Sequence, residues 1–258
     1  MKIKEDLIFD IGLHTGEDTA FYLKKGYYVV AVEANPVLAD HCRRKFDKAI
    51  ASGRLIILNA GIADKPGILP FYVNHYSSEW SSFDKAIGTR NNTKYEVIEV
   101  PCIKTESLFR DYGIPYYMKV DIEGYDYLSL NDIPDSGEKP SYVSCEATNI
   151  SLLDTLKTKG YTRFKLINQA NSFRPLNEKL EGKQYYILYR KMKHAVKHKL
   201  RHIIKEKYMG GSSGPFGEDT KGEWKTYDEI RHAYIDFNQG DLNIPVNYIS
   251  WCDFHAAL

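Results

Sequence analysis

The stretch Leu7-Ile-Phe-Asp-Ile-Gly-Leu-His-Thr-Gly16 decides the fold of this chain. Its apolar run Leu7 to Phe9 is too short for a helix and predicts a buried parallel strand. The two glycines that follow predict a tight turn into a helix. A second apolar strand, Tyr27 to Val32, comes next and ends in Glu33. A strand, a glycine turn, a helix and a strand ending in an acid are typical of a βαβ nucleotide-binding unit.

The spacing of this turn indicates the kind of ligand. The pattern D-x-G-x-x-x-G, which begins at Asp10, differs from the G-x-G-x-x-G that seats a pyrophosphate on a helix N-terminus. Asp10 brings negative charge to the place where a pyrophosphate would lie, which argues against a dinucleotide. S-adenosylmethionine fits better, with its ammonium at Asp10 and its ribose diol at Glu33. An ordinary βαβ crossover, whose glycines only make turns, is the alternative.

Composition limits the class of protein. The 258 residues suit one domain with an appendage, and a hydrophobic fraction of 43% supports a sizeable core. A net charge of +1 gives no overall attraction to nucleic acid. The four cysteines are scattered without a C-x-x-C, which indicates neither a zinc site nor a disulfide framework. With no signal-peptide pattern and no apolar run of membrane-spanning length, we expect a cytoplasmic protein.

Polar residues follow several of the predicted strands. Gly61 comes after an apolar strand and would let an adenine lie close to the backbone, although a plain turn explains it equally well. Asp121 and Glu146 follow two further strands. Because the carboxyl ends of parallel strands face one crevice, we expect Glu33, Asp121 and Glu146 to meet there. Helix capping is the alternative role for Asp121 and Glu146.

The simple alternation of strands and helices breaks between Lys65 and Val100. Two predicted strands there frame the polar segment His75 to Phe83, and a loop of that length is usually functional or mobile. Trp80, Ser81 and Ser82 could line a cofactor or sugar pocket, or could cap a helix that begins near Phe83.

The C-terminal third is less regular. Tyr161 to Ile167 and Gln184 to Tyr189 predict an antiparallel pair of strands at the sheet edge. The basic segment 190–208 carries three histidines four residues apart, His194, His198 and His202; a solvated basic helix explains this better than a metal site or contact with anionic lipid or nucleic acid. The tail contains Trp251, so we expect it to fold back on the domain, where it could cover the acceptor site.

Four blocks resemble the FkbM family of S-adenosylmethionine-dependent methyltransferases. They are Asp-Ile-Gly-x-x-x-Gly-Glu-Asp-Thr from residue 10, Val-Glu-Ala-Asn-Pro from residue 32, Asn-Ala-Gly-Ile-Ala-Asp from residue 59, and Lys-Val-Asp-Ile-Glu-Gly-Tyr-Asp from residue 119. The last block is the most family-specific, and the resemblance covers roughly residues 5 to 190.

The resemblance implies an α/β class I methyltransferase fold: a Rossmann-like, doubly wound, mostly parallel seven-stranded sheet with an antiparallel edge strand. It suggests a methyltransferase domain over residues 1–190 and a C-terminal helical or loop extension over residues 191–258. It further implies cofactor contacts at Asp10, Gly12, His14, Thr15, Gly16, Asp18, Glu33, Ala34, Gly61 and Asp121. Family members often carry a small or amide residue at the position of His14.

Members of the family mostly methylate hydroxyls, often on sugars or polyketide-derived products, and convert the cofactor to S-adenosylhomocysteine. The resemblance therefore implies an O-methyltransferase for a sugar, glycan or glycosylated product. Asp121, Glu146 or His14 could take the hydroxyl proton. Asp121 and Glu146 could instead hold a divalent cation. Trp80, Ser82 and Glu123 are the candidate substrate contacts.

Two other functions stay open at this point. A nicotinamide-dependent sugar oxidoreductase or epimerase is disfavoured by the missing G-x-G-x-x-G. A non-catalytic nucleotide-binding module is disfavoured by the concentration of acids at one sheet edge. For partners, we expect a small-molecule or glycan acceptor, no nucleic acid and no membrane span, and a homo-oligomer is left open.

Overall fold

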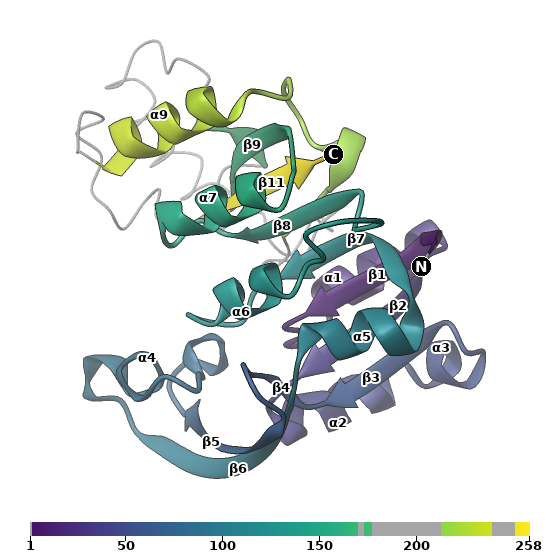
Figure 1. Ribbon diagram of the computed structural model, residues 1–258. Coiled ribbons are helices and arrows are strands. Elements are labelled where there is room, and N and C mark those ends of the chain that lie inside the picture. The colour runs from purple at the N-terminus through teal and green to yellow at the C-terminus, as the bar shows by residue number, and fades with distance from the viewer. Residues whose placement is uncertain (1, 170–172, 177–212, 239–250) are drawn as a thin grey trace, which may run out of the picture.

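The computed structural model describes residues 2–169, 173–176, 213–238 and 251–258 (Figure 1). Within these residues the main sheet has eight strands in the order β10-β9-β11-β8-β7-β1-β2-β3. Their bounds are β1 (Ile3–Ile11), β2 (Tyr28–Glu33), β3 (Leu55–Asn59), β7 (Ile114–Val120), β8 (Tyr142–Glu146), β9 (Arg163–Asn168), β10 (Arg174–Pro175) and β11 (Cys252–Ala257).

The strand directions confirm the fold expected from the sequence. Strands β3, β2, β1, β7 and β8 pair in parallel. Strand β11 runs antiparallel between β8 and β9, and the short β10 pairs antiparallel with β9 at the edge. This is a doubly wound, mostly parallel sheet.

The antiparallel neighbour of β9 comes from the end of the chain. The strand expected at Gln184–Tyr189 lies outside the described residues, whereas Cys252–Ala257 is buried throughout and joins β8 to β9. The sheet thus takes a strand from beyond residue 190. The division of the chain at that residue stays a prediction.

Helices cover both faces of the sheet, which explains why the central strands are apolar without alternation. Phe9 and Ile11 of β1 pack on the face covered by α5, α6, α7 and α9, whereas Ile8 packs on the face covered by α1 and α2. The helix bounds are α1 (Glu17–Lys25), α2 (Pro36–Lys45), α3 (Asp47–Ala51), α4 (Lys85–Gly88), α5 (Thr105–Tyr112), α6 (Asp126–Asn131), α7 (Ile150–Thr158) and α9 (Tyr227–Asn238). None of the described helices is long and apolar enough to cross a membrane.

The insertion between β3 and α5 forms a second, three-stranded sheet of order β4-β6-β5 (Figure 1). Its strands are β4 (Gly61–Ile62), β5 (Gly67–Asn74) and β6 (Tyr95–Ile103). Between β5 and β6 the chain turns through a short 3₁₀ helix at Ser78–Trp80 and through α4. Tyr72 and Ser82 exchange backbone hydrogen bonds, which ties this polar segment to β5.

Candidate active site

A cavity of about 510 Å³ lies at the carboxyl ends of the parallel strands. Residues 12–14 line it after β1, Glu33 and Ala34 at the end of β2, residues 121–125 after β7, and Glu146 at the end of β8. The insertion adds residues 78–81 and Arg90, and the C-terminal tail adds Trp251. A cavity of this size at this edge of an α/β sheet is typical of a ligand site.

Gly12 allows two strand ends to meet at the floor of the cavity. Its φ of +95° lies in the left-handed region, and a Cβ there would come within 1.9 Å of the carbonyl oxygen of Asp121. The N–H groups of Gly12 and Leu13 both donate to the carbonyl of Val32 at 3.0 Å. Only glycine fits this turn, because both the backbone angle and the close approach exclude a side chain.

Glu33 is held by two backbone donors at the end of β2. The N–H of His14 donates to its Oε2 at 2.7 Å, and the N–H of Asn35 donates to its Oε1 at 2.8 Å. Burial raises the pKa of Glu33 to about 7, although both hydrogen bonds oppose the rise. Each oxygen has a further lone pair, so this fixed carboxylate can accept two more hydroxyl groups.

His14 links this turn to the insertion. It has a φ of +50°, and its Nε2 lies 2.7 Å from Oγ of Ser78. Both residues line the cavity. The side chain of His14 thus joins the turn after β1 to the 3₁₀ helix of the insertion.

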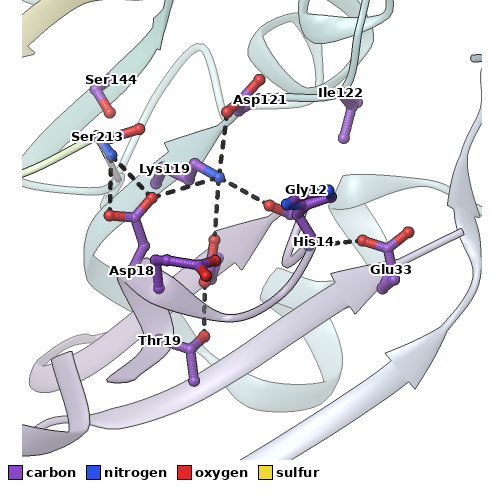
Figure 2. Close-up of polar contacts among 12 residues, drawn as sticks. Gly12, His14, Asp18, Thr19, Glu33, Lys119, Asp121, Ile122, Ser144 and Ser213 are labelled. Carbon is purple, nitrogen blue, oxygen red and sulfur yellow. Dashed lines mark hydrogen bonds and ion pairs between the residues drawn. The ribbon is translucent and has the colours of Figure 1, made fainter. Parts of the chain in front are cut away.

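Lys119 lies at the centre of a group of carboxylates (Figure 2). Its Nζ donates to the carbonyl of Gly12 at 2.8 Å and forms ion pairs with Asp10 at 3.4 Å, Asp121 at 3.5 Å and Asp18 at 3.7 Å. Burial by itself would lower the pKa of Lys119, but the three carboxylates outweigh it and raise that pKa well above its ordinary value. Lys119 therefore stays charged, and it compensates part of the negative charge at this end of the cavity.

Asp121 and Glu146 follow a pair of residues in register on neighbouring strands, Val120 of β7 and Cys145 of β8. Both line the cavity, as the sequence predicts. Burial, reinforced by the charge of Asp121, raises the pKa of Glu146 to about 8. A carboxyl group with this pKa can both hold and release a proton near neutral pH.

Arg90, Trp80 and Glu123 join the insertion to the loop after β7. Nη2 of Arg90 donates to Oε2 of Glu123 at 2.9 Å, and its guanidinium lies 4.7 Å from the centre of the Trp80 ring. Burial raises the pKa of Glu123 to about 7, while Arg90 opposes the rise. All three side chains line the cavity, so this cluster forms part of its wall.

Most of the residues predicted from the sequence line the cavity. These are Gly12, His14, Asp18, Glu33, Ala34, Gly61, Trp80, Asp121, Glu123 and Glu146. The space beside Gly61 is filled from within the protein, because a Cβ there would lie 2.1 Å from Cζ of Phe83. An adenine near Gly61 would therefore also meet the ring of Phe83, which lines the cavity too.

The other four predicted residues, Asp10, Thr15, Gly16 and Ser82, do not line the cavity. Asp10 is fully buried and accepts a hydrogen bond from Thr19 at 2.6 Å. Thr15 donates to Glu17 at 2.5 Å, and Gly16 precedes α1 with a φ of +80°. Ser82 donates to the carbonyl of Glu123 at 2.7 Å, and its neighbour Ser81 lines the cavity instead.

Other lining residues carry little signal in the sequence. Lys119 belongs to the most family-specific block, so its importance could have been predicted, but Arg90 lies in the insertion, outside every quoted block. Tyr125 and Thr148 also line the cavity, as does Trp251 of the tail that the sequence predicts to fold back. Within residues 2–169, 173–176, 213–238 and 251–258, no group of three or more His, Cys, Asp or Glu residues is placed to hold a metal ion. The geometry therefore gives no support to the divalent cation considered at Asp121 and Glu146.

Comparisons with known proteins place the chain in a family. Residues 10–161 match the family model of the methyltransferase FkbM domain. No curated protein matches the chain. Among solved structures, methyltransferase FkbM from Methylobacillus flagellatus KT has 14% sequence identity and a TM-score of 0.43; the match covers 64% of this chain and 40% of that one.

Two further solved structures match over nearly the whole chain. StiE O-MT (residues 942–1257) has 11% identity and a TM-score of 0.38, over 98% of this chain and 67% of that one. The [4+2]-cyclase SpnF has 9% identity and a TM-score of 0.38, over 98% of this chain and 74% of that one. The family model covers more than half of the sequence, and on that ground the chain belongs to the FkbM methyltransferase family.

Proposed function

We propose that this protein is an S-adenosylmethionine-dependent O-methyltransferase that acts on a hydroxyl of a sugar, glycan or glycosylated product. One observation carries the proposal: a single cavity has Glu33 at one strand end and Asp121 and Glu146 at two others. A carboxylate for a ribose and carboxyl groups for an acceptor hydroxyl are what such a transfer needs. Family membership favours this function over a nicotinamide-dependent oxidoreductase and over a non-catalytic nucleotide-binding module.

The residues present fit the nucleoside part of the cofactor. Both oxygens of Glu33 are fixed by backbone N–H groups and can each accept a ribose hydroxyl. The apolar side chains of Leu38, Phe71 and Phe83 line the same cavity and suit an adenine ring.

The residues at the Lys119 end fit the amino-acid part. A methionine moiety carries an ammonium and a carboxylate, and the cavity wall there offers the acids Asp18 and Asp121 and the ammonium of Lys119, which pairs with both. Asp10 touches Lys119 from behind the wall, so the contribution that we assign to it is indirect. We place the ammonium of the cofactor at Asp18 and Asp121.

When bound, S-adenosylmethionine supplies an electrophilic methyl group on a sulfonium. The protein positions the acceptor oxygen and receives its proton. Glu146, whose pKa burial raises to about 8, suits the role of the base, with Asp121 beside it orienting the hydroxyl. His14 is the second candidate for the base, because it also lines the cavity.

The acceptor end of the cavity combines aromatic rings with acids. Trp80, Tyr125 and Trp251 line it together with Glu123 and Glu146. Flat apolar rings and hydrogen-bonding carboxyl groups suit a carbohydrate, which has both C–H faces and hydroxyls. Trp251 lies beyond residue 190, which supports the proposal that the C-terminal extension packs on the domain and covers the acceptor site.

The first test is binding. Titration calorimetry on the purified protein is expected to show binding of S-adenosylmethionine and S-adenosylhomocysteine, and fluorescence titration with NADH is expected to show none. Replacing Glu33 by Ala should weaken the binding of both adenosyl ligands by about 1.5–3 kcal/mol, which is the typical contribution of a hydrogen bond to a charged group. A mass-spectrometric screen for methyl gain on sugars and glycans then tests the acceptor. No binding of either adenosyl ligand would contradict the proposal.

A further inference from the structure

The C-terminal part of the chain reaches the carboxylate of Asp18. Asp18 lies in the first turn of α1, is 4% exposed and lines the cavity. The backbone N–H of Ser213 lies 3.0 Å from each of its two carboxylate oxygens (Figure 2). A residue 195 positions away in the sequence thus binds an acid at the wall of the cavity.

The segment that carries Ser213 is firmly anchored. The ring of Phe216 stacks on Tyr117 of β7, with centroids 4.1 Å apart and planes 2° from parallel. Phe216 also meets Tyr22 of α1 edge-on at 5.6 Å. Farther along, the carbonyl of Thr220 accepts a hydrogen bond from Lys165 at 2.9 Å. Contacts with the sheet and with α1 therefore fix the place of the Ser213 N–H.

An amide that donates to both oxygens also fixes the orientation of the carboxylate. The Asp18 group is held between this N–H and Lys119, whose Nζ lies 3.7 Å from Oδ2. Hydrogen bonds to an ionised acceptor are stronger than those between neutral groups.

We propose that the peptide N–H of Ser213 positions Asp18 to bind the ammonium of the cofactor's methionine moiety, so that the C-terminal segment completes the cofactor site. This inference rests on the proposed function, because it takes S-adenosylmethionine as the ligand. Ser213 is a positioning residue in this arrangement, and it contributes its backbone and not its hydroxyl.

The substitution Ser213→Pro removes the amide hydrogen, and Ser213→Ala keeps it as the matched control. Calorimetry would compare S-adenosylhomocysteine with 5′-methylthioadenosine, which has the nucleoside and sulfur but no amino-acid end. The Pro variant is expected to bind S-adenosylhomocysteine at least tenfold more weakly while its affinity for 5′-methylthioadenosine stays as in the wild type. The Ala variant is expected to bind both ligands as the wild type does.

Equal S-adenosylhomocysteine affinity in the Pro variant and the wild type would overturn the inference, as would a parallel loss for both ligands. If the Pro variant does not fold, hydrogen exchange of the Ser213 amide in the wild type tests the inference instead. The inference requires S-adenosylhomocysteine to slow that exchange more than 5′-methylthioadenosine does, and equal slowing would overturn it. If the wild type binds neither ligand, the proposed function itself is contradicted, and this outcome is distinct from a failure of the inference about Ser213.

Discussion

The ammonium of Lys119 lies 3.5 Å from Oδ2 of Asp121, at the border between a buried group of charges and the cavity. The side chain of Lys119 is 5% exposed, whereas that of Asp121 is 32% exposed. Lys119 thus pairs with buried acids on one side and with a solvent-accessible acid on the other. Lys119 therefore both neutralises buried acids at the sheet edge and contributes to the charge of the cavity wall that a ligand contacts.

Replacing Lys119 by Met should destabilise the fold by about 3–5 kcal/mol, because it leaves buried carboxylates without their cation. This loss of unfolding free energy relative to the wild type should be larger at pH 8 than at pH 5. Burial raises the pKa of Asp10 to about 6 even against the charge of Lys119, so without this cation Asp10 favours folding while it is protonated, and that advantage is lost as the pH rises through its raised pKa. Urea unfolding at both pH values measures this.

The control for this experiment is Lys104→Met. Lys104 forms ion pairs with Asp132 and Glu106 at the surface, where such pairs contribute little. Its unfolding midpoint should stay close to that of the wild type. Similar losses in the two variants would mean that the charges around Lys119 are already screened by water.

Replacing Gly12 by Ala should cost more than about 4 kcal/mol, the range of exceptional substitutions. The new Cβ would meet the Asp121 carbonyl at 1.9 Å in addition to the strained φ of +95°. Gly26→Ala separates the two causes, because Gly26 has a φ of +100° but nothing within 4 Å of an added Cβ. Its cost should be only the 1–2 kcal/mol of a left-handed Ala. Equal losses in denaturant unfolding would show that the contact with Asp121 is unimportant.

The sequence predicts the first βαβ unit well because its signals are local. An apolar run, two glycines and a terminal acid each have one main structural meaning, and the structure has β1, α1 and β2 where the pattern puts them. Glu33 could be predicted for the same reason: it ends a strand, and strand ends face the crevice.

For other predicted residues, the direction of the side chain decides whether the residue lines the cavity, and the sequence does not give that direction. Asp10 lies within β1 and shares a face with Ile8, so it points under α1 towards Thr19 and not into the crevice. Ser81 and Ser82 are neighbours in an extended segment, and only the pairing of Ser82 with Tyr72 decides which of the two lines the cavity.

Strand β11 could not be predicted from its own residues. Its sequence, Cys-Asp-Phe-His-Ala-Ala, contains no β-branched residue, and Asp and Ala are depleted in strands. Pairing with β8 and β9 on both sides decides its structure instead. The contact of Ser213 with Asp18 is equally invisible, because it joins residues far apart through a backbone group.

Replacing Arg90 by Lys should raise the KM for the acceptor while the affinity for S-adenosylhomocysteine stays the same. Lysine keeps the charge but loses the planar stacking on Trp80 and the fixed geometry towards Glu123. Steady-state kinetics and calorimetry measure the two quantities. A loss of cofactor affinity with an unchanged KM would place Arg90 at the other end of the cavity.

Glu146→Gln should stabilise the protein at pH 8 relative to the wild type, and the gain should shrink towards pH 5. Burial raises the pKa of Glu146 to about 8 in the folded state, from 4.5. The wild type therefore loses stability as the pH rises from about 4.5 through 8, whereas the amide does not titrate. Glu138→Gln, at an exposed position, is the control and should show no such trend. A pH-independent difference between Glu146→Gln and the wild type would contradict the raised pKa.

Glu146 also allows a direct test of which residue is the base. If Glu146 is the base, kcat/KM of the wild type should rise with pH through about 8, because only the deprotonated carboxylate accepts a proton. Glu146→Gln should lower turnover by about 10²–10⁴ and abolish that rise, while calorimetry shows unchanged cofactor binding. Asp121→Asn should lower turnover but keep the rise, since its proposed roles are to orient the hydroxyl and to bind the cofactor ammonium, and not to accept the proton. If the rise survives in Glu146→Gln and disappears in His14→Gln, then His14 is the base and Glu146 only shapes the acceptor site.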